Sequence, residues 1–138
     1  MINRILVAYD GSGPADKAFS FALDLAKKYQ ATVTVLAVAK PPDFAEDVET
    51  EAILENSQKH YRKSLMHLKP RAESAGIGVT FEVAVGHPAE QIIFHAERDK
   101  ADLIVMGHRG KAFFERMRLG SVSKQVIHYA NCAVTVVR

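Results

Sequence analysis

The sequence has little of what marks several broad classes of protein. Its one cysteine, Cys132, excludes an internal disulfide framework and a cysteine-rich zinc site. Lys and Arg number 18 against 16 Asp and Glu, a balance too even for a dedicated nucleic-acid-binding protein. No apolar run approaches the roughly 20 residues that a membrane-spanning helix requires. The opening Met1-Ile2-Asn3-Arg4 has no signal-peptide pattern, so a cytoplasmic protein without a membrane partner is expected.

What is present is the composition of an ordinary globular chain. Hydrophobic residues make up 48% and charged residues 25%, which argues against a disordered chain. The length of 138 residues is close to that of one domain, so residues 1–138 are expected to form a single folding unit.

Apolar runs alternate with amphipathic stretches along the whole chain. The predicted strands are residues 5–8, 33–39, 77–85, 103–106 and 133–137. Helices are predicted from Pro14 to Tyr29, around 61–72, around 89–96 and from Ser121 to about Ala130. Pro70 should kink or split the second of these, and Gly76 should end it. The acidic segment 43–58 is left open between loop and helix.

This alternation predicts an α/β fold. We expect a doubly wound, Rossmann-like sheet of five parallel strands in the order 3-2-1-4-5, with helices on both faces. Ligands bind such sheets beyond the carboxyl ends of the strands. Two loops at that edge, residues 10–13 and 107–110, are therefore expected to flank one crevice.

The segment from Gly107 to Ser121 has the composition of a phosphate site. Gly107 and Gly110 bracket two residues, nine more follow, and Gly120-Ser121 opens the last helix. Glycines allow close approach of the backbone to a ligand, and the first N–H groups of a helix bind anions. The alternative is structural: the first two glycines make a turn, and Ser121 caps a helix.

The pattern Gly107-x2-Gly110-x9-Gly120-Ser121 resembles the nucleotide signature of the universal stress protein family, in its ATP-binding class. The resemblance covers nearly the whole chain and includes residues 5–12, 86–88, 101–107 and 132–137. It implies ATP as the ligand, with Mg²⁺ or Mn²⁺ held by the phosphates. It also implies a homodimer formed through the C-terminal strand, residues 133–137.

The same resemblance implies a role for each residue of the site. Asp10 would accept hydrogen bonds from the ribose, and Val38 would contact adenine. The remaining nucleotide-binding residues implied are Ala8 and Met106 in the pocket wall, the backbone of Gly107, Arg109, Gly110, Gly120 and Ser121, and Val122 and Ser123 at the helix start. Some members have proline in place of Ala8 and a histidine-type residue in place of Arg109, and neither departure removes a backbone donor.

Each candidate side chain also has a structural interpretation. Asp10 can stabilise a turn with Ser12. His108 has no orienting partner in the sequence, so a loop or dimer-contact role is expected. Cys132 is interpreted as a small core residue at the start of a buried strand. The other histidines are expected mostly on polar helix faces or in turns and are assigned no metal: His60, His67, His87, His95 and His128.

The glycine pattern is not that of a P-loop, because it lacks the lysine and the paired Ser or Thr. No catalytic residue is assigned, and a non-enzymatic role is favoured. The leading hypothesis is a regulatory ATP-binding protein of the stress response whose nucleotide state changes its shape or its partners, an unidentified protein partner among them. The alternatives are an ATP-independent dimeric interaction protein of the same fold, or a slow ATPase.

Overall fold

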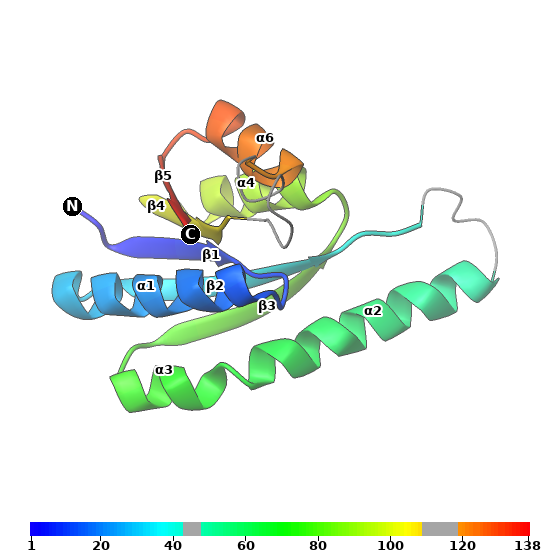
Figure 1. Ribbon diagram of the computed structural model, residues 1–138, viewed down its shortest axis with the longest axis horizontal. Helices are drawn as coiled ribbons and strands as arrows, with labels where there is room; N and C mark the ends of the chain where they lie inside the picture. Colours follow the sequence, from blue (N-terminus) through cyan, green and yellow to red (C-terminus); the bar gives the residue numbers. More distant parts are fainter. Residues whose placement is uncertain (43–47, 109–118) are drawn as a thin grey trace.

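The computed structural model describes residues 1–42, 48–108 and 119–138 (Figure 1). Five parallel strands form one sheet in the order β3-β2-β1-β4-β5, so the predicted fold class and strand order are confirmed. The strands are β1 (Arg4–Ala8), β2 (Thr32–Ala39), β3 (Val79–Val85), β4 (Leu103–Gly107) and β5 (Ala133–Val137). The helices are α1 (Gly13–Tyr29), α2 (Val48–Met66), α3 (Lys69–Ala75), α4 (Pro88–Arg98) and α6 (Ser121–Tyr129).

Helices cover both faces of the sheet (Figure 1). Successive side chains of a strand point to opposite faces, so β1 supplies both cores. Val7 packs with Phe19 of α1 and Leu65 of α2 on one face. Leu6 packs with Val126 of α6 on the other face, where α4 also lies. The central strand is therefore buried on both sides, as its continuous apolar run predicts.

The register of the sheet aligns the carboxyl ends of β1 and β4. Ala8, the last residue of β1, pairs with Met106, one residue before the end of β4. On its other side Ala8 pairs with Leu36, and β2 continues three residues further, to Ala39. The loops that follow β1 and β4 therefore begin next to each other.

Pro70 splits the second predicted helix, in agreement with the sequence. α2 ends at Met66 and α3 begins at Lys69, with the proline in the first turn, where its missing N–H costs no hydrogen bond. The following strand begins later than predicted. Gly76 adopts a left-handed φ of 69°, and Ile77 N donates to Ala72 O (3.2 Å), so both residues close the helix rather than extend the strand.

α2 begins at Val48, so residues 48–58 of the acidic segment are helical, while 43–47 lie outside the described residues. Among the described side chains of α2, only Leu65 is buried. Figure 1 shows the N-terminal end of this helix running away from the sheet. No helix within the described ranges combines the length and apolar character needed to cross a membrane.

β5 lies at the edge of the sheet, as predicted. The expectation of a buried strand after Cys132 is wrong, because Val134 and Val136 are only half-buried and Ala133 is exposed. An edge strand has a hydrogen-bonded neighbour on one side only, so its apolar side chains are less enclosed than those of β1.

Candidate functional site

A cleft opens at the carboxyl edge of the sheet, beyond the ends of β1, β2 and β4. The space between its walls, open solvent included, is about 620 Å³. The first turns of α1, α4 and α6 contribute Ala15, Pro88 and Val122 to its wall. The positive ends of three helix dipoles therefore lie at one cleft and favour an anionic ligand.

The structure brings most of the predicted site residues together. Those that line the cleft are Ala8, Asp10, Val38, Met106, Gly107, Val122 and Ser123. Gly120 and Ser121 stand at the start of α6, next to this wall, without forming part of it. Arg109 and Gly110 lie outside the described residues.

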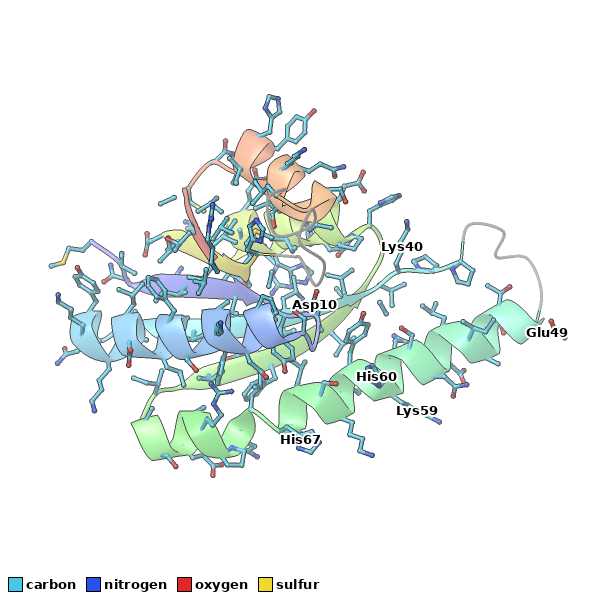
Figure 2. The ribbon with its side chains drawn as sticks, viewed as in Figure 1. Asp10, Lys40, Glu49, Lys59, His60 and His67 are labelled. Atoms are coloured by element: carbon cyan, nitrogen blue, oxygen red, sulfur yellow. The ribbon has the colours of Figure 1, made fainter. Side chains whose placement is uncertain are left out.

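Asp10 takes part in a compact turn before α1 (Figure 2). Its Oδ1 accepts hydrogen bonds from Ser12 N (3.0 Å) and from Ser12 Oγ (2.5 Å). Ser12 Oγ in turn accepts from Ala15 N (3.2 Å) and caps the helix. Asp10 thus stabilises a turn with Ser12, as its structural interpretation predicts. The same bonds fix the orientation of a carboxylate at the cleft.

The start of α6 presents backbone donors that the helix itself does not use. Gly120 is the N-cap residue, with φ −63° and ψ 156°, and as a glycine it supplies no capping side chain. Lys124 N donates to Gly120 O (3.0 Å), whereas the first three N–H groups, of Ser121, Val122 and Ser123, have no acceptor within the helix. Val122 and Ser123 line the cleft, so these donors suit an anion there.

Gly107 has a packing role that the glycine pattern does not reveal. A β-carbon built on Gly107 would lie 2.5 Å from the carbonyl carbon of Pro14 and 2.7 Å from Ala15 N. The first turn of α1 therefore packs directly on the end of β4. Only glycine leaves room for that backbone contact.

Tyr9 supports the floor of the cleft beside Asp10. Its hydroxyl donates to Asp16 Oδ1 (2.9 Å) in the first turn of α1. Burial, reinforced by this hydrogen bond, raises the pKa of Tyr9 to about 12. Arg71 of α3 lies 3.8 Å from the same Asp16 oxygen and 5.0 Å from the Phe19 ring centroid, so α3 is tied to this corner. Tyr9 thus stays protonated as a hydrogen-bond donor.

Sequence reasoning missed half of the cleft wall. The lining residues it did not assign are Tyr9, Ser12, Ala15, Leu36, Tyr61, Pro88 and Ile92. The helical period of Tyr61, Leu65 and Leu68 places Tyr61 on the packed face of α2. Nothing in that period shows that this face reaches the end of β1.

Two histidines are buried. His95 is 7% exposed, so its expected place on a polar face is wrong: it follows Ile92 by three residues and shares that residue's buried side of α4. Its Nδ1 donates to Gln91 O (2.8 Å), and Nε2 lies 3.7 Å from Glu82 Oε2. His108 is also buried, and its N donates to Val137 O (2.7 Å), tying the end of β4 to β5.

No group of three or more His, Cys, Asp or Glu side chains in the described ranges is placed to hold a metal ion. Cys132 is half-buried and packs against the core that holds Leu6 and Val126, so it lies at the margin of the core. Burial raises the pKa of its thiol, with the Asp102 carboxylate as a further cause. A raised pKa disfavours the reactive thiolate.

The whole chain, residues 1–138, matches the model of the universal stress protein family. A universal stress protein of Methanocaldococcus jannaschii is 36% identical over 141 residues, which span all of this chain and 83% of the relative. The structure is similar to that of universal stress protein UspA from Lactobacillus plantarum, with a TM-score of 0.91 and 26% identity over 99% of this chain and 98% of that one.

A solved relative carries a nucleotide. The universal stress protein from Archaeoglobus fulgidus in complex with dAMP has a TM-score of 0.68 and 23% identity, with both chains fully covered. At 23% identity this similarity shows a shared fold and no more. The family model, in contrast, matches every residue, and the relative from Methanocaldococcus jannaschii is 36% identical, so the chain belongs to the universal stress protein family.

Proposed function

We propose that the protein is an ATP-binding regulatory protein of the stress response. The observation that carries this proposal is the start of α6, with glycine as its N-cap residue, at a cleft that also holds the oriented carboxylate of Asp10. The first N–H groups of a helix suit phosphates, and a carboxylate suits ribose hydroxyls. Nucleotide binding by the relative from Archaeoglobus fulgidus supports the same class of ligand.

In this proposal the cleft divides into three parts. Val38, Ala8 and Met106 form the apolar part that takes adenine. Asp10 accepts from the ribose. The phosphates lie along Gly107 and the start of α6, with Arg109 and Gly110 assigned by the family signature alone. Mg²⁺ or Mn²⁺ would enter with the phosphates.

Calorimetric titration with ATP, with and without Mg²⁺, tests the proposal. We expect saturable binding near one ATP per chain. Asp10→Ala should weaken binding by about ten- to a hundredfold, because charge-assisted hydrogen bonds contribute about 1.5–3 kcal/mol. Asp24→Ala, at an exposed position of α1 outside the cleft, is the matched control. Absence of heat at millimolar ATP would contradict the proposal.

Asp10→Asn separates the two tasks of this residue. An asparagine oxygen can still accept from Ser12 N and keep the turn, but it carries no charge. Weaker ATP binding by this variant at unchanged thermal stability supports a ligand role. Full affinity in both Asp10 variants would restrict the residue to the turn.

A second candidate is an ATP-independent interaction protein of the same fold. The packing of α1 on Gly107 favours it, because that contact requires a glycine without any ligand. In this candidate the cleft is a by-product of the fold. The same titration distinguishes the two.

We also propose a homodimer formed through β5. The strand lies at the sheet edge with half-buried valines, Val134 and Val136, and an unpaired edge favours pairing with a second copy. Sedimentation at micromolar concentration should give twice the 15.2 kDa of one chain. A mass of one chain across that range would exclude this dimer.

A further inference from the structure

Among the described side chains of α2, Tyr61 alone lines the cleft. The helix passes close to the β1–α1 loop, since a β-carbon on Gly11 would lie 3.9 Å from Ser64 Oγ. Tyr61 stands one turn before Ser64, lines the cleft and is half-buried. An aromatic ring from α2 thus lines the same cleft as Asp10.

The hydroxyl group of Tyr61 is available for contact with a ligand. It packs against the core on the face of the sheet that holds α1. No described residue hydrogen-bonds to its hydroxyl, whereas Tyr9 is held by Asp16. No buried side-chain polar atom within the described ranges lacks a partner, so the Tyr61 hydroxyl is accessible. The side chain can therefore meet a ligand without giving up a bond.

The opposite wall of the cleft is apolar. Ile92 and Met106 belong to the core on the other face of the sheet and line the same cleft. A ring from one face and aliphatic side chains from the other thus approach the sheet edge from opposite sides. Such a slot suits a flat, neutral heterocycle, which gains from contact with a ring on one side and apolar atoms on the other.

We propose that Tyr61 is the base-recognition residue of the nucleotide cleft and favours purine nucleotides over base-free sugar phosphates. The inference rests on the proposed function. It adds a determinant that lies outside the glycine signature. The π-face of a base is what an aromatic side chain recognises, so the phosphate sites should be insensitive to this residue.

The test compares ATP with ribose 5-triphosphate, which has the same sugar and phosphates but no base. Tyr61→Leu should weaken ATP binding by about tenfold or more, since base stacking on an aromatic side chain contributes at that level. Its affinity for ribose 5-triphosphate should equal that of the parent protein. Tyr61→Phe keeps the ring and should bind ATP within about twofold of the parent protein.

Tyr29→Leu, a tyrosine at the exposed end of α1, is the matched control and should change neither affinity. Equal losses for both ligands in Tyr61→Leu would make the residue merely structural and overturn the inference, as would unchanged ATP binding. Failure of the parent protein to bind ATP would overturn the proposed function, and the inference with it.

A spectroscopic measurement on the parent protein tests the inference even if the Tyr61→Leu variant does not fold. Fluorotyrosine labelling of the parent protein gives four ¹⁹F signals, one per tyrosine, and Tyr61→Phe identifies that of Tyr61. This signal should shift with ATP and stay in place with ribose 5-triphosphate. Equal shifts with both ligands, or none with ATP, would contradict base recognition.

Discussion

Replacing Gly107 with alanine is expected to lower the free energy of unfolding by about 3 kcal/mol, and the melting temperature by about 10 °C. The added methyl group would lie 2.5–2.7 Å from backbone atoms of Pro14 and Ala15, which cannot rotate away as a side chain can. Either β4 or the first turn of α1 must move. Thermal or urea unfolding followed by circular dichroism measures the loss.

Gly78→Ala is the matched control for this substitution. Gly78 precedes β3, and a β-carbon there would meet no atom within 4 Å outside its chain neighbours. Alanine also has less backbone freedom than glycine in the unfolded chain, so stability should be unchanged or slightly raised. If Gly107→Ala is as stable as this control, the close packing of α1 on β4 is wrong.

Gly120→Val is expected to lower ATP affinity by about a hundredfold or more while the fold is kept. The φ of −63° and ψ of 156° at Gly120 are open to valine, so the backbone need not change. In the proposed binding mode the phosphates lie at the start of α6, and we expect the branched side chain to obstruct their approach to its first N–H groups. Losing two charge-assisted hydrogen bonds, about 1.5–3 kcal/mol each, accounts for the magnitude. Calorimetry and far-ultraviolet circular dichroism measure the two quantities.

Two comparisons make the Gly120 experiment specific. Gly78→Val places the same side chain at a position with open space, outside the cleft, and should leave ATP binding intact. Adenosine, which has no phosphates, should bind Gly120→Val about as well as it binds the parent protein. Retained ATP affinity in Gly120→Val would show that the phosphates do not lie at the start of α6.

The fold could be predicted because its signals are local. Continuous apolar runs specify the inner strands, and Pro14 and Pro70 specify where helices begin. The predicted strand begins two residues before β3, because Ile77 is a β-branched residue that favours strands. In the structure its backbone N–H instead donates to Ala72 O and closes α3. Strand composition alone cannot show that a hydrogen bond has been taken by the preceding helix.

Site residues at the end of a strand or the start of a helix could be predicted from the sequence. Those that reach the cleft only through tertiary packing could not. Asp10 and Val122 follow from their places at a strand end and a helix start. Tyr61 could not be assigned, because only the tertiary arrangement brings α2 to the end of β1. Gly107 was assigned for its approach to a ligand, and its contact with α1 is visible only in three dimensions.

The packing of α1 on Gly107 has a consequence for the entropy of ligand binding. The contact joins the end of β4 to the helix whose cap, Ser12, also holds Asp10. The Asp10 turn and the end of β4 are therefore packed together as one unit. A molecule that bridges them meets groups already set in place, so little conformational entropy is lost there on binding. The conformational entropy of these groups is lost when the chain folds and need not be lost again when a ligand binds.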